Sequence, residues 1–296
     1  MRGAHLRLAV TGLSGQVVSA IIERAPKDVE IIALGRPQLE LSRREAVLTS
    51  LRHAGCDIII NAAAYTQVDK AESEPDLAMR VNGEGAGNVA QAAAELGVPL
   101  LHLSTDYVFD GLLDRPYRED DATHPTSVYG RSKLAGEEHI RATHPQHVIL
   151  RTAWVYSPFG ANFVKTMLRL GADRDEVSVV ADQIGNPTNA LDIADALLKI
   201  ALKLSHNAIP ADYGTFHMCG QGTASWAEMA EAIFETALGF GRKPVRVRRI
   251  TTQEYPTAAK RPANSRLDTQ KLESVYGITL PHWRFSLDAC VARLLK

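Results

Sequence analysis

The chain has 296 residues, of which 45% are hydrophobic, and a formal net charge of −1. This length and composition can bury a sizeable core, either in one large domain or in a main domain with a smaller cap. The near-zero charge offers no electrostatic attraction for nucleic acid or an anionic membrane, and no apolar run approaches the roughly 18 residues needed to cross a bilayer.

Three cysteines, Cys56, Cys219 and Cys290, are isolated and far apart in the sequence. Their spacing fits neither a disulfide framework nor a zinc site, and free thiols indicate a reducing cytoplasm. Residues 1–5 lead directly into an apolar run and lack the pattern of a signal peptide. We therefore expect a cytoplasmic protein without a bound metal.

The first predicted strand, residues 6–10, is followed at once by a glycine turn and by a helix over residues 16–24. Glycines let the backbone approach a ligand closely, and the free amides of a helix N-terminus bind pyrophosphate. Val18 stands where a small residue usually allows close packing of helix and strand, which predicts a slightly displaced helix. The residues expected to contact a dinucleotide here are Gly12, Gly15, Gln16 and Val17.

The second predicted strand, residues 30–34, ends at Gly35 and Arg36. Many NAD-binding chains carry an acidic residue at this point, which holds the ribose 2′-hydroxyl. An arginine can instead pair with a 2′-phosphate, so we expect NADPH as the preferred cofactor, with NADH as the alternative. A solvated loop charge is the other interpretation of Arg36. Glu40 and Leu41 are expected on the adenine side.

Strands near 57–64, 99–103 and 147–152 alternate with helices near 43–54 and 76–96. This alternation predicts right-handed βαβ units, and therefore an α/β fold with a Rossmann-type doubly wound parallel sheet. Small residues at the carboxyl end of a strand leave room for a cofactor. The expected cofactor contacts at the ends of the third and fourth strands are Ala63, Ala64, Tyr65 and Leu103.

From about residue 153 the pattern loosens. We expect residues 1–152 to form an NAD(P)-binding Rossmann domain, and residues 153–296 to form mainly a smaller C-terminal α/β substrate-binding lobe with some segments returning to the first domain. The helices and strands predicted in this half lie near 162–170, 177–180, 190–204, 215–218, 225–238 and 286–295.

Tyr129 and Lys133 are four residues apart on a predicted helix that follows a long polar loop, residues 108–127. Such residues share one face of a helix. A free phenol has a pKa of about 10, and a nearby cation lowers it, which helps proton transfer near neutral pH. The spacing alone is common on helices. Its place after a strand that ends in Thr105 makes the pair a candidate for acid–base chemistry.

Several longer runs are more specific than this spacing. They are Val68–Glu72, Ser104–Gly111, Val128–Glu137, Arg151–Tyr156, Asp182–Thr188 and Arg261–Leu267. Through these runs the chain resembles the extended short-chain dehydrogenase/reductases, and within them the dTDP-4-dehydrorhamnose reductases, over nearly its whole length.

The resemblance implies NADPH-dependent reduction of the C4 ketone of dTDP-4-dehydro-L-rhamnose to dTDP-L-rhamnose, the last step of dTDP-L-rhamnose biosynthesis. It implies that Tyr129 donates a proton, that Thr105 hydrogen-bonds the carbonyl, and that Lys133 lowers the tyrosine pKa and holds the nicotinamide ribose. Tyr129 and Lys133 would thus also contact the cofactor. The residues expected to bind substrate are Thr105, Asp106, Trp154, Asn162 and Arg261, with Lys165 and Arg266 as further candidates for its phosphates; for Asn162, Lys165, Arg261 and Arg266 a surface or helix-capping role is the alternative.

Two other functions stay open on the same resemblance. One is a related sugar-nucleotide reductase, epimerase or dehydratase, although a dehydratase needs a further acid–base group beside the threonine, and here Asp106 is followed by Tyr107. The other is a non-catalytic NADP-binding subunit that regulates methionine adenosyltransferase. The expected partners are a nucleotide-sugar substrate and a second copy of the chain in a homodimer, without nucleic acid or membrane.

Three further features receive structural interpretations. His139, His144 and His147 do not share one helical face, and we expect a solvated surface cluster. The alternating valines and arginines of residues 242–249 predict an edge strand with a charged outer face. Trp226 and Trp283 are expected in the core or an interface.

Overall fold

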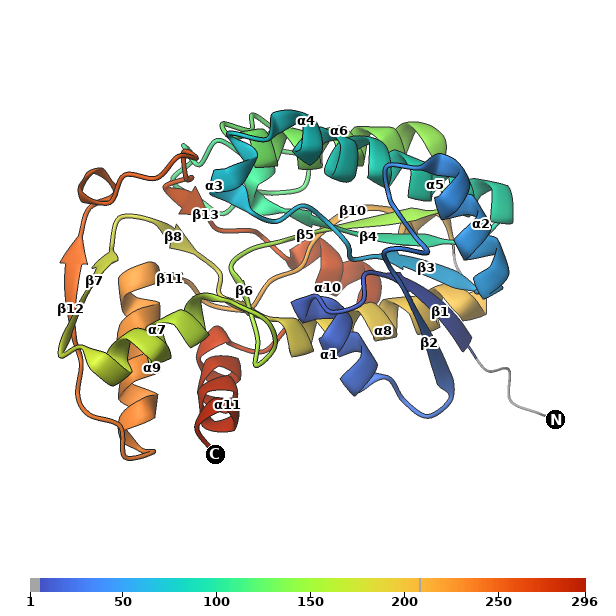
Figure 1. Ribbon diagram of the computed structural model, residues 1–296. Coiled ribbons are helices and arrows are strands. Elements are labelled where there is room, and N and C mark those ends of the chain that lie inside the picture. Colours follow the sequence, from blue (N-terminus) through green and yellow to red (C-terminus); the bar gives the residue numbers. More distant parts are fainter. Residues whose placement is uncertain (1–5, 208) are drawn as a thin grey trace.

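The computed structural model describes residues 6–207 and 209–296, and its central feature is a six-stranded parallel sheet (Figure 1). The order in which the chain adds strands reverses between the neighbouring strands β1 and β3. At such a switch point, α/β sheets bind ligands at the carboxyl ends of their strands. The predicted α/β Rossmann-type fold is confirmed. In spatial order the strands are β10 (Gly214–His217), β5 (His147–Thr152), β4 (Leu100–Thr105), β3 (Ile58–Asn61), β1 (Leu6–Thr11) and β2 (Val29–Leu34).

Helices cover both faces of the sheet, as its apolar strands require (Figure 1). Successive side chains of a strand point to opposite faces, so Ile58 and Ile60 join one hydrophobic cluster and Ile59 joins the other. The helices of the first face are α1 (Gln16–Arg24) and α8 (Ala190–Asn207), and those of the second are α2 (Arg44–Ala54), α5 (Gly85–Leu96) and α6 (Val128–Thr143).

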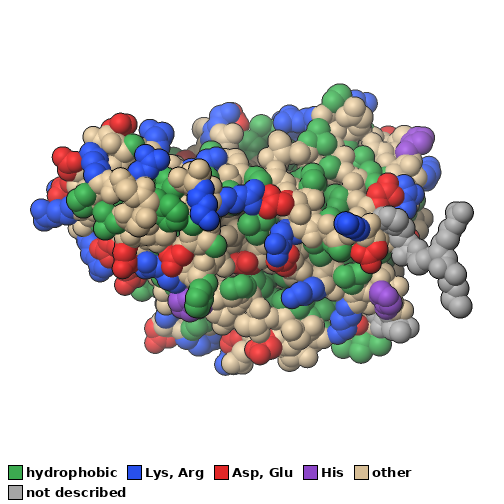
Figure 2. Space-filling view, turned by 90° about the horizontal axis from the view of Figure 1, so that it is seen from below, with side chains coloured by type: hydrophobic (Ala, Val, Ile, Leu, Met, Phe, Trp, Pro, Cys, Tyr) green, Lys and Arg blue, Asp and Glu red, His purple; other side chains and the backbone are tan. Residues whose placement is uncertain are grey.

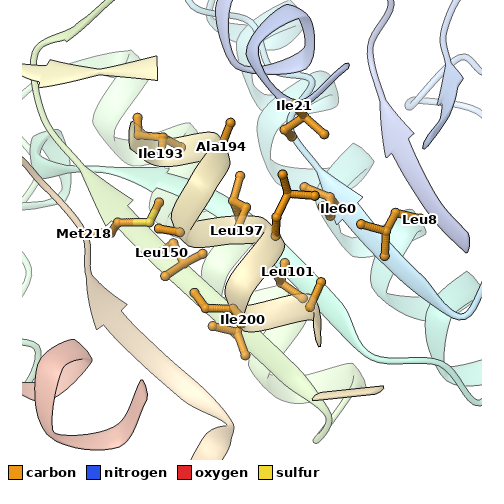
Figure 3. Close-up of a cluster of buried hydrophobic side chains, with 14 of the residues drawn as sticks. Leu8, Ile21, Ile60, Leu101, Leu150, Ile193, Ala194, Leu197, Ile200 and Met218 are labelled. Carbon is orange, nitrogen blue, oxygen red and sulfur yellow. The ribbon is translucent and has the colours of Figure 1, made fainter. Parts of the chain in front are cut away.

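Helix α8 lies across the middle of the first face (Figure 3). Its Leu197 and Ile200 are fully buried among strand side chains such as Leu101 and Leu150. Burying a leucine or isoleucine contributes about 1.5–3 kcal/mol each. A helix from the second half of the chain therefore completes the core of the sheet, and strand β10 from the same half forms its edge.

A second hydrophobic cluster lies beyond the sheet, at the left of Figure 1. It joins three helices to a two-stranded parallel sheet. The division at residue 152 into a cofactor domain and a substrate lobe stays a prediction. The elements are α7 (Phe163–Asp173), α9 (Trp226–Leu238), α11 (Trp283–Leu295), β7 (Glu176–Val180) and β12 (Arg246–Ile250).

Short elements connect these layers. They are α3 (Val68–Ala71), η2 (Asp106–Val108), β6 (Val155–Tyr156), β8 (Ile184–Gly185), β9 (Thr188–Asn189), η3 (Pro210–Asp212), β11 (Ala224–Ser225), η4 (Thr252–Glu254), β13 (Asn264–Ser265) and α10 (Gln270–Tyr276).

The alanine-rich segment predicted as an interrupted helix over 76–96 contains a π-helical stretch. It runs through α4 (Pro75–Ala78), η1 (Met79–Glu84) and α5. Asn82 of η1 accepts a hydrogen bond from the Tyr65 amide at 2.7 Å and donates to the Tyr65 carbonyl at 3.0 Å. It also donates to Ser132 at 3.0 Å. The widened turn thus ties the segment after β3 to helix α6, and such π-turns are frequent at functional sites.

The third strand is shorter than the predicted 57–64. It ends at Asn61 because the amides of Ala62 and Ala63 donate to the Thr11 hydroxyl at 3.1 and 3.0 Å and leave the strand ladder. By contrast, the predicted edge strand of arginines and valines is confirmed as β12, which pairs in parallel with β7.

The expectation of a solvated histidine cluster is wrong for two of its three members. His144 and His147 are buried, whereas His139 is exposed as expected. Each ring lies within hydrogen-bonding distance of a backbone carbonyl: His139 of Gly83, His144 of Val98, and His147 of His144. Tertiary packing, which helical periodicity does not report, buries the rings of His144 and His147.

In the face shown in Figure 2, basic and acidic side chains lie interspersed. Within the described part of the chain, no helix is both long and apolar enough to cross a membrane. The three cysteines are free, with Cys219 and Cys290 buried. The predicted lack of a signal peptide concerns residues 1–5, which lie outside the described residues.

Candidate active site

A single cleft of about 1340 Å³ lies at the carboxyl edge of the sheet. Apart from Lys165 and Arg266, every residue predicted to bind cofactor or substrate, or to act in catalysis, lines it. The structure therefore brings the candidates together, while their individual roles stay predictions. They are Gly12, Gly15, Gln16, Val17, Gly35, Arg36, Glu40, Leu41, Ala63, Ala64, Tyr65, Leu103, Thr105, Asp106, Tyr129, Lys133, Trp154, Asn162 and Arg261.

The glycine turn after β1 forms a cradle at one end of the cleft. Gly12 has φ +106°, a backbone conformation that other residues rarely adopt. Gly15 caps α1 without any side-chain hydrogen bond to the helix amides, and the first turn of α1 carries no acidic residue. The first amides of α1 are thus available to an anion, and the cradle suits a pyrophosphate. Buried Val18 fits here with its Cγ2 3.1 Å from where a Gly12 Cβ would lie.

The end of β2 adds a basic side to this cradle. Gly35 permits close approach to Leu13, whose Cγ would lie 2.7 Å from a Cβ at this position. Arg36 is exposed, and no other described residue forms a hydrogen bond or ion pair with its guanidinium. Arg80 of η1 lines the same cleft. Two cations near the expected adenine ribose suit a negatively charged group.

Helix α6 is held close to the sheet at its N-terminal end. Ser127 caps the helix by accepting from the Gly130 amide at 3.1 Å, and a Glu72 carboxylate oxygen accepts from the Val128 amide at 2.8 Å. A Cβ on Gly130 would lie 2.2 Å from the Tyr107 carbonyl, and one on Gly136 would lie 2.2 Å from the Asn82 carbonyl. These two glycines therefore set how deeply the helix sits.

Helix α6 also carries a buried ion pair. Glu137 accepts from Arg151 Nε at 3.0 Å and Nη2 at 2.7 Å, and its Oε1 accepts from the Ser104 hydroxyl at 2.6 Å. Both charged side chains are almost completely inaccessible to solvent. Because Ser104 precedes Thr105, this network fixes the helix relative to the end of β4.

Tyr129 and Lys133 face the cleft, but their electrostatics differ from the prediction. Desolvation, followed by the nearby Asp106 carboxylate, raises the Tyr129 pKa above its ordinary value, while the Thr105 hydroxyl lowers it. Burial lowers the pKa of Lys133 to about 8. The expected depression of the tyrosine pKa by Lys133 is therefore absent here, because the Lys133 Nζ atom turns to the Leu103 carbonyl at 2.7 Å.

Asp106 lies deep in the cleft beside the candidate acid–base pair. Its Oδ1 accepts from the Thr105 hydroxyl at 2.9 Å, whereas its buried Oδ2 has no hydrogen-bond partner among the described residues. Burial raises its pKa to about 6, against hydrogen bonds that lower it. Thr152, which pairs with Thr105 across the strands, also lines the cleft with an unpartnered hydroxyl. Two unpartnered oxygens thus lie where a polar ligand would meet them.

Two tryptophans form the far wall of the cleft. Trp154 stacks on Trp226 with ring centroids 3.6 Å apart and an 8° angle between planes. Trp154 has φ +48°, and its ring fits because Gly185 has no side chain: a Cβ there would lie 2.5 Å from Trp154 Cε2. Trp226 also donates to Gln183 at 3.2 Å. The expectation that Trp226 lies away from the site is therefore wrong.

The candidates for substrate phosphates separate into two groups. Asn162 and Arg261 line the cleft, whereas Lys165 and Arg266 do not. Asn162 caps α7 and donates to Gln16 at 3.0 Å. Arg261 donates to Asp69 at 2.6 Å and to the Tyr107 hydroxyl at 3.0 Å, and so bridges two sides of the cleft.

Lys165 and Arg266 have structural contacts instead. The Lys165 ammonium group lies 3.5 Å from the Pro158 carbonyl and lines a different cavity. Arg266 donates to the Asn264 side chain at 2.8 Å and to the Asp114 carbonyl. For these two residues the structural alternative is the better interpretation.

Arg80 and Thr152 of the cleft wall were not predicted from the sequence, and neither were two residues that contact predicted site residues. His102 lies beneath Lys133, and Trp226 stacks on Trp154. For Trp226 a local signal existed, because Ser225 and Glu228 form a capping box that places it at the first position of α9. The signal for His102 was a polar residue inside an otherwise apolar strand, Leu100–Leu103.

Comparison with known proteins gives consistent matches along nearly the whole chain. The family model described as "RmlD substrate binding domain" matches residues 6–296. A dTDP-4-dehydrorhamnose reductase of Sinorhizobium fredii is 51% identical over 290 residues, 98% of each chain. The protein of that name from Escherichia coli is 43% identical over 247 residues, 83% of this chain and 82% of its own.

Solved structures agree. A dTDP-4-dehydrorhamnose reductase from Clostridium acetobutylicum superposes with a TM-score of 0.91 at 38% identity, covering 98% of this chain and 100% of that one. One from Bacillus anthracis, solved in complex with NADP, has a TM-score of 0.91 at 37% identity and covers 97% and 99%.

The fit of Trp154 against Gly185 generates a first prediction. Gly185→Ala places a methyl group 2.5 Å from a Trp154 ring atom. This clash should break the tryptophan stack, which near-ultraviolet circular dichroism of the two indoles would report. Gly239→Ala is the matched control, because its Cβ would approach no described atom closer than 3.4 Å. An unchanged spectrum for Gly185→Ala would contradict the assigned packing.

A second prediction concerns the pH dependence of stability. The folded-state pKa of Asp106, about 6, lies above the ordinary aspartate value of 3.8. Folding therefore favours the protonated acid, and this contribution is present below pH 4 and lost as pH rises through 6. As pH rises from 4 to 7, the unaltered protein should lose about 2 kcal/mol of its free energy of unfolding relative to Asp106→Asn, which has no carboxyl to ionise.

Chemical denaturation of both proteins across this pH range measures that difference. The same substitution at the exposed loop residue Asp114 gives the baseline. A difference for Asp106→Asn that stays constant with pH would show that the buried carboxyl is not destabilised on ionisation.

Proposed function

This chain belongs to the dTDP-4-dehydrorhamnose reductase family, and we propose that it reduces the C4 ketone of dTDP-4-dehydro-L-rhamnose to dTDP-L-rhamnose with NADPH as the reductant. The observation that carries this proposal is the single cleft that joins a glycine-turn cradle to Thr105, Tyr129 and Lys133. Relatives that share 40–51% identity over most of the chain bear this enzyme's name, which supports the same substrate.

The cradle residues fit a dinucleotide. Gly12 and Gly15 allow close approach of the backbone, and the uncapped amides of α1 suit the pyrophosphate. Arg36 and Arg80 would meet a ribose 2′-phosphate, which supports NADPH over NADH, and a relative was solved in complex with NADP. When bound, the nicotinamide supplies the hydride.

Tyr129 is proposed as the proton donor. Desolvation keeps its phenol protonated, so the proton is retained until negative charge develops on the ketone oxygen. An alkoxide is a stronger base than a phenolate, and the transfer then runs downhill. The Thr105 hydroxyl, which shares a hydrogen bond with Asp106, is positioned to orient the same oxygen. Lys133 is proposed to hold the ribose hydroxyls of the cofactor and to support the charge that Tyr129 acquires.

The wall of the cleft is proposed to hold the substrate's sugar and nucleotide. The stacked rings of Trp154 and Trp226 offer an apolar surface, and Asp106 offers an unpartnered oxygen. Arg261 is the proposed phosphate contact, for which it would exchange its bond to Asp69. Binding energy from these remote groups orients the ketone.

The cellular location and the assembly state are proposals as well. We propose a cytoplasmic location, which the free thiols Cys56, Cys219 and Cys290 support. A homodimer is the proposed assembly.

The central test is an NADPH-oxidation assay with dTDP-4-dehydro-L-rhamnose. The unaltered protein should oxidise NADPH, and Tyr129→Phe should lower kcat by about 10²–10⁴-fold because general acid catalysis is lost. NADPH binding, followed by its fluorescence, should persist. Tyr213→Phe is the control, since Tyr213 lies outside the cleft.

Two results would count against this assignment in different ways. Equal rates for the unaltered protein and Tyr129→Phe would remove the proposed proton donor. Absence of NADPH oxidation together with co-purification of methionine adenosyltransferase would show that the protein is a regulatory subunit and not a reductase.

Cofactor preference forms a separate prediction. Arg36→Ala should raise KM for NADPH about tenfold and leave KM for NADH nearly unchanged, because a charge-assisted bond to a phosphate contributes about 1.5–3 kcal/mol. Arg43→Ala, a nearby exposed change outside the cleft, should alter neither value. Parallel changes in both KM values would show that Arg36 does not read the 2′-phosphate.

A further inference from the structure

A chain of four buried polar side chains runs beneath the cleft, from Thr11 through Asn61 and His102 to Lys133. The Thr11 hydroxyl and the Asn61 Oδ1 are 2.7 Å apart, the Asn61 Nδ2 and the His102 Nδ1 are 3.0 Å apart, and the His102 Nε2 and the Lys133 Nζ are 3.3 Å apart. All four side chains are at most 3% exposed. These side chains are therefore shielded from bulk water, and each must find its hydrogen-bond donors and acceptors among its neighbours.

The direction of these hydrogen bonds is fixed at the Thr11 end. The Thr11 oxygen already accepts from the backbone amides of Ala62 and Ala63, at 3.1 and 3.0 Å. A hydroxyl oxygen has two lone pairs, so its own O–H must donate to Asn61. Asn61 consequently presents Oδ1 to Thr11 and its NH₂ group to His102. The reversed amide would direct a third donor at an oxygen that has no lone pair left.

The orientation of Asn61 determines the tautomer of His102. Its Nδ1 accepts from Asn61 and therefore carries no proton, and a neutral imidazole then carries its proton on Nε2. Burial holds the His102 pKa well below its ordinary value, so the ring is neutral. The Nε2–H group thus points at the nitrogen of Lys133.

An ammonium group has three donors and no lone pair, so it cannot accept from this N–H group. A neutral amine can accept it, and can still donate to the Leu103 carbonyl at 2.7 Å. The observed position of Lys133 therefore matches the uncharged amine. A protonated Lys133 would be repelled by His102 and would turn toward the cleft, where Tyr129 lies.

We propose that His102, oriented by Thr11 and Asn61, is a positioning residue that favours the uncharged amine of Lys133 in the cofactor-free protein and couples the protonation of Lys133 to its movement toward Tyr129. This inference rests on the proposed role of Lys133 in the reductase. It explains why buried polar residues stand at the carboxyl ends of β1 and β3 and in the interior of β4.

The coupling has a consequence for proton delivery. After the Tyr129 O–H bond has broken and the substrate O–H bond has formed, the phenolate regains a proton from the Lys133 ammonium group. That N–H bond breaks, a phenol O–H bond forms, and the amine left behind is stabilised by the His102 N–H group. Solvent reprotonates Lys133 before the next turnover. Stabilising the uncharged amine makes Lys133 a stronger acid toward Tyr129.

Other charges near Lys133 act in the opposite sense or not at all. Glu137, one turn along α6, raises the Lys133 pKa, but it is paired with Arg151 of β5 and Arg141. Asp106 of η2 raises the pKa of Tyr129. Arg80 of η1 lines the cleft, and His147 of β5 lowers the pKa of His102. His102 is thus the one polar group of β4 whose hydrogen meets the Lys133 nitrogen.

Nuclear magnetic resonance of the cofactor-free protein tests this proposal without substrate or cofactor, so its failure is separate from failure of the reductase assignment. Long-range ¹H–¹⁵N spectra distinguish the two histidine tautomers, and His102→Phe identifies the relevant signals. The expected result is the neutral Nε2–H form of His102 throughout pH 6–9. An Nδ1–H or doubly protonated ring would overturn the proposal.

Asn61→Asp provides the sharper variant. A carboxylate at this position accepts from His102 Nδ1, which reverses the tautomer and presents the Nε2 lone pair to Lys133. The ¹³Cε titration midpoint of Lys133, assigned with Lys133→Met, should then rise by about one pH unit or more. Asn88→Asp, the same change at an asparagine bonded to a backbone carbonyl, should leave the tautomer unchanged.

An unchanged tautomer and midpoint in Asn61→Asp would contradict the proposed coupling. If this variant does not fold, the tautomer measured in the unaltered protein still decides between the two outcomes.

Discussion

The buried ion pair between Glu137 and Arg151 is the interaction on which the geometry of the site depends. It joins α6 to β5, and the Ser104 hydroxyl extends it to β4. A buried pair contributes little net stability, because desolvation of both charges offsets their attraction, but losing one partner leaves an uncompensated charge. The pair therefore acts chiefly as a constraint on position. It sets where the face of α6 that carries Tyr129 meets the end of β4 that carries Thr105.

A second constraint on the same helix comes from absent side chains. Gly130 and Gly136 bring α6 against the carbonyls of Tyr107 and Asn82, and any Cβ would push the helix away. The ion pair and these close approaches together leave little freedom in the depth of α6. Catalytic groups need this kind of rigid support to keep their distances to a reacting atom.

Much of the fold and most of the cleft were predictable because they follow from local patterns. Helix 16–24 and strand 147–152 were predicted with their observed bounds. The carboxyl ends of parallel strands meet at one edge, so residues after successive strands converge without any knowledge of tertiary contacts. What sequence patterns did not report depends on packing between distant segments. Trp226 of α9 stacks on Trp154, and the buried ring of His144 lies within hydrogen-bonding distance of the Val98 carbonyl.

The placement of α8 and β10 has a consequence for how this chain is made. Both lie beyond residue 185, yet α8 covers the strand face that carries Leu101 and Leu150, and β10 pairs with β5. When only the first 152 residues have left the ribosome, α1 alone covers this apolar face and the edge of β5 is unpaired, a state prone to association. The two halves are accordingly not exchangeable modules: a gene fusion or truncation cut at the end of β5 would separate a core from its own cover.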